Sequence, residues 1–188
     1  SRITFPIRDV NARPVGFTGR IFEVDNNARI AKYINTPQTQ IYDKGNILFG
    51  LDKAKADIRR EDACVVVEGN MDVIMSHQAE VKNAVASSGT ALTDNQLKIL
   101  KRYTDNLILS FDQDDAGENA MKRGIDSALQ IGFNISLLDI DSDDLKDPAD
   151  LIKVNPALWP EKLKSTKSIV QFYFDKTFNK YDSSTAEG

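Results

Sequence analysis

Three carboxylates stand where two apolar runs end. The run VVV at 65–67 is followed by Glu68, and the run LILSF at 107–111 is followed by Asp112 and Asp114. Each run is predicted to be a buried strand of a parallel sheet that turns into a helix after these acids. Because the carboxyl ends of parallel strands share one edge of a sheet, where ligands bind, we expect the three side chains to lie close together.

Carboxylates gathered at one edge repel one another, and each pair costs about 4 kcal/mol at ~4 Å and an effective dielectric near 20. A divalent cation offsets that repulsion, and Mg²⁺ is usually held by a few carboxylates and phosphate oxygens. Asp112 and Asp114 are two positions apart in extended chain, so their side chains point the same way. The pattern therefore predicts a Mg²⁺-dependent phosphoryl-transfer site, and the alternative is a polar loop whose Asp115 caps the next helix.

Two further acids leave alternatives open. Asp72 lies four residues after Glu68, in the first turn of a predicted helix. It either turns back toward the metal edge or only stabilises the helix dipole. Asp147 lies beyond the last predicted strand, and its local pattern favours N-terminal capping of a helix that begins at Pro148.

The composition argues against several other kinds of site. His77 is the only histidine and Cys64 the only cysteine, which argues against a zinc site and a catalytic triad. The sequence contains no Walker A or G-x-G-x-x-G motif and no apolar run near the ~20 residues of a membrane span, and its N-terminal segment does not look like a signal peptide. Cys64 is interpreted as a small buried hydrophobe, and a single cysteine favours a reducing cytoplasm.

The charge is unevenly distributed along the chain. Residues 1–60 hold 11 Lys and Arg against 6 Asp and Glu, whereas residues 61–188 hold 13 against 22. A basic first third beside an acidic remainder suits a polyanion-binding face next to a metal site, although ordinary surface variation explains it equally well. Basic and aromatic residues also interleave there, which is typical of binding to a single nucleic-acid strand; they are Arg8, Arg13, Arg20, Arg29, Lys32 and Lys44 with Phe5, Phe17, Tyr33 and Tyr42.

From residue 62 onward, strands are predicted to alternate with helices. Strands are expected near 63–67, 83–87, 106–111 and 134–140, and helices near 71–79, 94–103 and 116–131. Thr93 begins a capping-box sequence, and Gly132 stands where a left-handed C-cap belongs. Strands joined by crossover helices pair in parallel, so we predict an α/β fold with about four parallel strands and flanking helices.

The flanking segments are predicted to be organised differently. Residues 2–9 and 13–24 are expected to be strands, with Pro6 marking an edge or a bulge. Residues 36–46 are expected to be a loop and residues 47–57 a helix. After residue 141 we expect a short helix from Pro148, a break between Pro156 and Pro160 with Trp159 as a packing anchor, and an amphipathic helix over 168–178.

Several ordered motifs resemble a known family. EGNMD at 68–72 and FDQDDAG at 111–117 resemble the TOPRIM domain of primases, topoisomerases and some nucleases. The upstream motifs resemble the RNA polymerase core of bacterial DnaG-type primase; they are FPIRD at 5–9, GFTGR at 16–20, KYINTPQT at 32–39 and YDKGNILFGLDKA at 42–54. NAVASSGTALT at 83–93 and KDPAD at 146–150 follow in the same order, so the resemblance covers residues 1 to about 155.

This resemblance implies template-directed synthesis of short RNA primers on single-stranded DNA during replication, by Mg²⁺-dependent nucleotidyl transfer, with Mn²⁺ able to substitute. It implies that Glu68, Asp112 and Asp114 are catalytic and that the metal is held by Glu68, Asp72, Asp112, Asp114 and Asp147. It implies that nucleoside triphosphates and the DNA template are bound by Arg20, Lys32, Asn35 and Lys44. A replicative helicase is the further expected partner, through a domain absent from this chain, and no zinc or membrane is expected.

The chain departs from the family pattern at several positions. Gln113 replaces the usual glycine, Asp115 the usual arginine, Asn70 an aromatic residue and Ala149 the second acid of the D-P-D element. The zinc ribbon and the helicase-binding domain of the family are missing, so we expect a fragment with little activity alone. Residues 1–60 are expected to be part of the basic N-terminal subdomain, 61–145 the TOPRIM domain and 146–188 the start of a helical subdomain.

Two other functions remain open at this point. A TOPRIM nuclease or topoisomerase fragment would share the acidic motifs, although no tyrosine here has the local context of a topoisomerase nucleophile. A regulatory module that binds nucleotides or alarmones without catalysis would share the fold.

Overall fold

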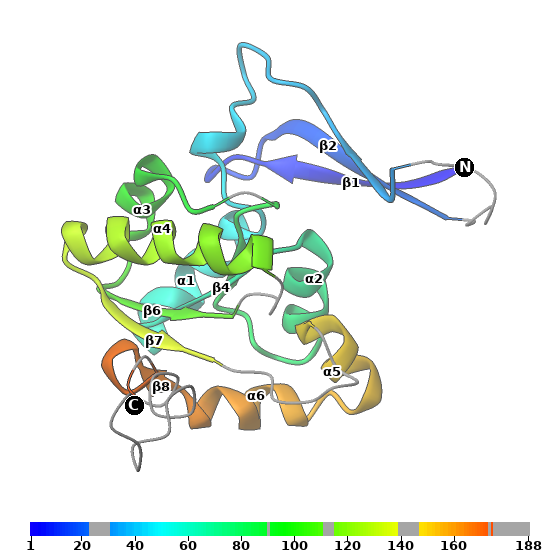
Figure 1. Ribbon diagram of the computed structural model, residues 1–188. Helices are drawn as coiled ribbons and strands as arrows, with labels where there is room; N and C mark the ends of the chain where they lie inside the picture. The colour runs from blue at the N-terminus through cyan, green and yellow to red at the C-terminus, as the bar shows by residue number, and fades with distance from the viewer. Residues whose placement is uncertain (23–30, 90, 111–114, 139–146, 173, 175–188) are drawn as a thin grey trace.

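The computed structural model describes residues 1–22, 31–89, 91–110, 115–138, 147–172 and 174. Its centre is a five-stranded sheet in the order β5-β4-β6-β7-β8 (Figure 1). The strands are β4 (Cys64–Val67), β5 (Ala84–Ala86), β6 (Asn106–Leu109), β7 (Asn134–Leu137) and β8 (Lys167–Ser168). The first four pair in parallel, as predicted, and β8 adds an unpredicted antiparallel edge.

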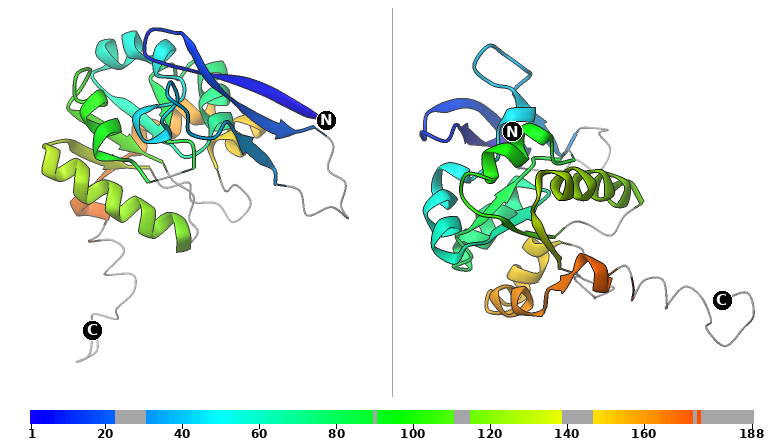
Figure 2. Two further views of the ribbon diagram at one scale, coloured as in Figure 1. Left: turned by 90° about the horizontal axis from the view of Figure 1, so that it is seen from above. Right: turned by 90° about the vertical axis from the view of Figure 1, so that its left-hand side faces the viewer.

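Helices cover both faces of this sheet. Five of them are α1 (Leu51–Glu61), α2 (Asn70–Gln78), α3 (Asp94–Leu100), α4 (Asp115–Ile131) and α5 (Pro148–Val154). Cys64 and Val66 face a core that includes residues of α1, α3 and α4, whereas Val65 and Val67 face one that includes residues of α2 and α5. Figure 2 shows α4 and α5 on opposite sides of the sheet. A strand covered on both faces reads as a continuous apolar run, which is why CVVV is buried at every position.

A second, antiparallel sheet is formed by the first 35 residues. Its order is β1 (Arg2–Arg8), β2 (Pro14–Ile21) and β3 (Tyr33–Asn35), of which β3 was not predicted. β1 is an edge strand, and its pairing with β2 shifts register between Ile7 and Arg8. Pro6 therefore lies where a missing N–H is tolerated, as its position in the sequence indicated.

The connection between the two sheets corrects the predicted start of a helix at residue 47. After the short 3₁₀ helix η1 (Lys44–Asn46), Phe49 forms an antiparallel bridge with Ala86 of β5. Gly50 then has φ +84°, and α1 begins only at Leu51. The Cβ of any other residue at position 50 would lie 2.6 Å from Cγ1 of Val73, so both conformation and space require glycine.

The C-terminal segment corrects a second prediction. The expected break between Pro156 and Pro160 is instead α6 (Leu158–Lys162), followed by the 3₁₀ helix η2 (Leu163–Ser165). Pro160 is the third residue of α6, within the first turn, where its missing N–H costs no helical bond. Trp159 is fully buried, as expected of a packing anchor. Residues 169–172 are helical, and most of the predicted helix over 168–178 lies outside the described residues.

Candidate active site

Glu68 lies at the carboxyl edge of the parallel sheet. It follows the last residue of β4, is half-buried, and its backbone carbonyl accepts a hydrogen bond of 3.1 Å from the N–H of Gly89. Val66 of β4 pairs with Leu109, the last residue of β6. The chain therefore leaves β6 at the edge where Glu68 lies, as expected of two parallel strands.

Asp112 and Asp114 lie outside the described residues. The described chain stops at Ser110, which is 1% exposed and whose backbone N–H donates to the carbonyl of Val66 at 2.9 Å. The Ser110 hydroxyl is buried and has no hydrogen-bond partner among the described residues. Buried polar atoms without a partner are uncommon, so this hydroxyl is an unusual feature of the described end of β6.

Sequence reasoning missed a polar loop that follows β5. Ser88 and Gly89 have φ of 63° and 76°, and the Ser88 hydroxyl donates to Oδ1 of Asn70 at 2.7 Å. This bond joins the loop after β5 to the first residue of α2, beside Glu68. The signal was present in the sequence, because a parallel strand near 83–87 had to end at the same edge as the strand before Glu68.

Asp72 lies in the first turn of α2 and is 7% exposed. Its Oδ2 accepts a hydrogen bond of 3.0 Å from the N–H of Gly69, and its Oδ1 accepts one of 3.3 Å from the N–H of Ala149. The side chain therefore reaches both the turn after β4 and the start of α5, rather than only lying along the helix axis.

Asp147 is the N-cap of α5, as its local pattern indicated. Its Oδ1 accepts a hydrogen bond of 2.7 Å from the N–H of Asp150. Pro148 follows as the first helical residue, and Ala149, which replaces an acid in the family pattern, is 6% exposed. Asp147 can therefore cap α5 and still lie near the acidic edge, because Asp72 contacts Ala149, two positions after Asp147.

A basic and aromatic pair from the antiparallel sheet lies near these acids. Arg20 of β2 pairs with Tyr33 of β3, and its guanidinium carbon is 5.8 Å from the centre of the Tyr33 ring. Burial raises the pKa of Tyr33; the positive charge of Arg20 opposes that rise, and the negative charges of Asp72 and Asp147 add to it. Tyr33 therefore lies within electrostatic reach of Asp72 in α2 and of Asp147 at the start of α5.

The other expected binding residues are distributed more widely. Asn35 pairs with Thr18 across the sheet, on the face that carries Arg20 and Tyr33. Oδ1 of Asn35 and the hydroxyl of Thr18 are both buried without a hydrogen-bond partner among the described residues. Lys32 precedes β3 and is exposed, whereas Lys44 lies in η1, which packs on α3. The structure thus groups Arg20 and Asn35 on one face and leaves Lys44 on a separate element.

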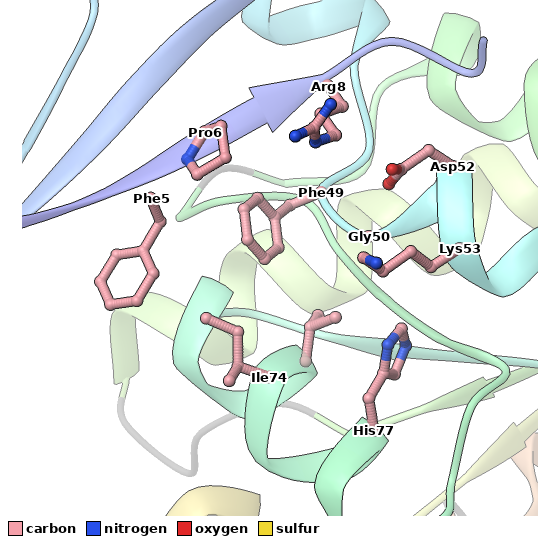
Figure 3. Close-up of a pocket in the computed structure, with 10 residues that line it drawn as sticks. Phe5, Pro6, Arg8, Phe49, Gly50, Asp52, Lys53, Ile74 and His77 are labelled. Atoms are coloured by element: carbon pink, nitrogen blue, oxygen red, sulfur yellow. The ribbon is translucent and has the colours of Figure 1, made fainter. Parts of the chain in front are cut away.

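A pocket of about 180 Å³ lies between β1, the start of α1 and α2 (Figure 3). Its walls are mainly apolar; they include Phe5 and Arg8 of the basic and aromatic set, but none of the residues expected to be catalytic, to hold the metal or to bind nucleotides. His77 lies at this pocket, and its Nε2 is 2.9 Å from the carbonyl oxygen of Ala84. The histidine is therefore tied to the backbone of β5.

Two features are absent from the part of the chain that the structure describes. No group of three His, Cys, Asp or Glu side chains in it is close enough to hold a metal ion. No helix in it has the length and hydrophobicity needed to cross a membrane.

Comparison with known proteins identifies two consecutive matches. A family model described as "DNA primase catalytic core, N-terminal domain" matches residues 1–55, and a model described as "Toprim-like" matches residues 65–152. A DNA primase of Clostridium acetobutylicum is 36% identical over 189 residues, which cover 100% of this chain and 30% of that protein. The chain therefore spans less than a third of the length of this curated relative.

Solved structures agree with these matches. A DNA primase domain from Pseudomonas aeruginosa superposes with a TM-score of 0.82 at 32% identity, covering 100% of this chain and 58% of that one. A DnaG primase catalytic domain bound to ssDNA superposes with a TM-score of 0.81 at 32% identity, covering 99% and 59%. The chain belongs to the DnaG-type DNA primase family, and its parallel sheet has the TOPRIM fold of that family's catalytic core.

Proposed function

We propose that this chain supplies the nucleotidyl-transfer site of a DNA primase, which makes short RNA primers on single-stranded DNA during replication. The observation that carries the proposal is the shared carboxyl edge of β4 and β6, where the register pairs Val66 with Leu109. Glu68 leaves one strand at that edge, and the segment with Asp112 and Asp114 leaves the other. Membership of the primase family supports nucleotidyl transfer as the reaction at this edge.

The acids at this edge suit Mg²⁺, with Mn²⁺ as a substitute, because carboxylate oxygens are the ligands that these hard cations prefer. Glu68, Asp112 and Asp114 would hold the cation, with Asp147 and Asp72 contributing to the same acidic group. The bound cation supplies stabilisation of the charge that develops during in-line displacement at a phosphate. The protein's own part is to hold the reacting groups in position, since phosphoryl transfer depends mainly on positioning and electrostatics.

The antiparallel sheet is proposed to bind the polyanionic substrates. Arg20 and Lys32 would contact phosphates of the nucleoside triphosphate and the template, with Lys44 as a further phosphate contact and Asn35 as a hydrogen-bonding group. The proximity of Arg20 and Tyr33 to the acidic group supports this assignment. The related DnaG catalytic domain bound to ssDNA makes a single strand the expected template.

The decisive experiment removes the two central carboxylates without changing their size. Asp112→Asn combined with Asp114→Asn, in the complete primase that contains this chain, should weaken Mn²⁺ binding. Primer synthesis should fall at least about 100-fold, because loss of the cation removes several kcal/mol of transition-state stabilisation. Primer synthesis is measured on single-stranded DNA with labelled nucleoside triphosphates, and Mn²⁺ binding is measured by titration.

A matched control changes two exposed acids instead. Asp94→Asn combined with Asp126→Asn removes the same charge from α3 and α4 and should change neither measurement. Unchanged Mn²⁺ affinity in the Asp112 and Asp114 double variant would refute the metal assignment. DNA nicking without RNA products would favour a TOPRIM nuclease or topoisomerase, and triphosphate binding without turnover would favour a regulatory module.

The same proposal covers the cellular location of the chain, its helicase partner and its subdomains. The chain would act in the cytoplasm at the replication fork, where a replicative helicase would be recruited through a part of the primase outside this chain. Residues 1–60, 61–145 and 146–188 would correspond to the basic subdomain, the TOPRIM domain and the start of the helical subdomain.

A further inference from the structure

One carboxylate connects two segments that are 77 residues apart in the sequence. Asp72 accepts the N–H of Gly69 with one oxygen and the N–H of Ala149 with the other. Gly69 directly follows Glu68, and Ala149 lies two residues after Asp147. The two residues expected to share a cation are therefore linked through the backbone by the side chain of a third.

The start of α5 shows why this link matters for position. The first N–H groups of a helix have no partner within the helix. In α5, the first residue is Pro148, which has no N–H, and the third, Asp150, donates to Asp147. The N–H of the second residue, Ala149, is satisfied by Asp72. The capping of α5 is thus completed by a residue of α2, which ties the location of Asp147 to that helix.

Burial shields the link from water. Asp72 is 7% exposed and Ala149 is 6% exposed, so water has little access to the bond between them. A hydrogen bond to an ionised carboxylate is stronger than one between neutral groups, and it gains further strength in a less polar environment. The neighbouring apolar residues of both helices, including Val73, Leu151 and Ile152, belong to one core and hold α2 against α5.

We propose that Asp72 is a positioning residue for the cation site: its two hydrogen bonds fix the place of Asp147 relative to Glu68. This inference rests on the proposed function, because it assigns Asp72 a role at the same site. Asparagine cannot replace it, because a carboxamide offers one acceptor oxygen and an N–H₂ group that would face an N–H. Asp72→Asn must therefore release either Gly69 or Ala149.

The first experiment uses the unchanged protein. Amide hydrogen exchange, followed by NMR, should show the N–H groups of Gly69 and Ala149 protected, and they should remain protected when Mn²⁺ or Mg²⁺ is added. Fast exchange at Ala149 without cation would overturn the link. Loss of protection on adding the cation would overturn the positioning role, because the carboxylate would then have turned to coordinate the ion.

The second experiment is a double-mutant cycle on Mn²⁺ affinity in the complete primase. Asp72→Asn should lower the affinity about tenfold, the lower end of what is typical for residues that orient metal ligands. If Asp72 acts through Asp147, the variant that carries both Asp72→Asn and Asp147→Asn should bind Mn²⁺ no more weakly than Asp147→Asn alone. Asp94→Asn, which removes an exposed first-turn carboxylate from α3, is the charge-matched control and should have no effect.

The remaining outcomes separate the roles. Losses that multiply in the double variant would show that Asp72 is an independent ligand and overturn the inference. A lower Tm with unchanged Mn²⁺ affinity would show a merely structural role and also overturn it. Absence of Mn²⁺ binding by the unchanged protein would overturn the proposed function but not the link itself, which the exchange measurement decides alone.

Discussion

The two sheets of this molecule use their side chains in opposite ways. Every residue of β4 in the parallel sheet is buried, so both faces of this strand pack against the core. The antiparallel sheet buries Ile7 and Thr18 but leaves Phe17 and Ile34 more than half exposed. The parallel sheet therefore offers Glu68 from a loop at its edge, whereas the antiparallel sheet offers side chains from its strands.

The register of the antiparallel sheet sharpens this contrast. Thr18 and Arg20 alternate with Gly19 along β2, and their partners on β3 are Asn35 and Tyr33. The four side chains therefore share one face, because side chains alternate along a strand. The parallel sheet is followed by Glu68 in a loop, and the antiparallel sheet presents Arg20 and hydrogen-bonding groups from its strands. Under the proposed function, the first sheet would hold the metal and the second would hold the polyanion.

The largest expected difference between the two sheets is in stability. Leu107→Ala in β6, where the side chain is 1% exposed, should lower the free energy of unfolding by about 2–5 kcal/mol, because it leaves a cavity in the core. Ile34→Ala in β3, where the side chain is 54% exposed, should change it by less than about 0.5 kcal/mol. Urea unfolding followed by circular dichroism measures both. Equal losses would show that the antiparallel sheet packs as tightly as the parallel one.

A smaller effect tests the junction between the sheets. Gly50→Ala should destabilise the protein by more than Gly89→Ala, although both residues have positive φ. At Gly89 nothing lies within 4 Å of an added Cβ, so only the conformational cost of about 1 kcal/mol remains. At Gly50 the added carbon also meets Val73 at 2.6 Å. Unfolding midpoints in urea should rank wild type, Gly89→Ala and Gly50→Ala in that order, and the reverse order would show that α2 shifts freely.

An effect that is negligible at pH 8 and appears only at alkaline pH concerns the interior of the parallel sheet. Cys64 is fully buried, and burial raises the pKa of its thiol. The unfolded chain ionises this thiol near pH 8.5, so its contribution to stability is complete below that pH and declines as the pH rises further. Relative to Cys64→Ala, the wild type should lose at most about 1.4 kcal/mol more per pH unit above this point. Urea titrations at pH 8 and pH 10 under reducing conditions measure the difference, and parallel losses would contradict it.

The parts of the fold that sequence predicted are those with strong local signals. Continuous apolar runs predicted the four parallel strands, and Thr93 caps α3 with the expected pair of bonds. The strands β3 and β8 have three and two residues, too few for a pattern to appear. The predicted start of α1 at residue 47 was wrong because Phe49 pairs with Ala86 of β5. The amphipathic spacing of residues 47–57 carries no information about that long-range contact.

The candidate site divides in the same way. Strand ends placed Glu68 at the carboxyl edge, and the Pro148 pattern identified Asp147 as an N-cap. The contacts of Asp72 could not be predicted, because the partner of its second oxygen depends on how α5 packs against α2. The pairing of Arg20 with Tyr33 also required the register of a strand that the sequence did not reveal.

The bridge between Phe49 and Ala86 has a consequence for behaviour in a crowded solution. The outermost strand of a sheet carries unpaired N–H and C=O groups that can recruit a second chain into a continuous ladder. Phe49 donates to and accepts from Ala86 at 2.9 and 3.1 Å on the β5 side, and β8 pairs with β7 on the other. Phe49 thus covers part of the β5 edge, and the opposite edge ends in β8, which has only two residues. A covered edge and a very short one both disfavour aggregation through strand addition.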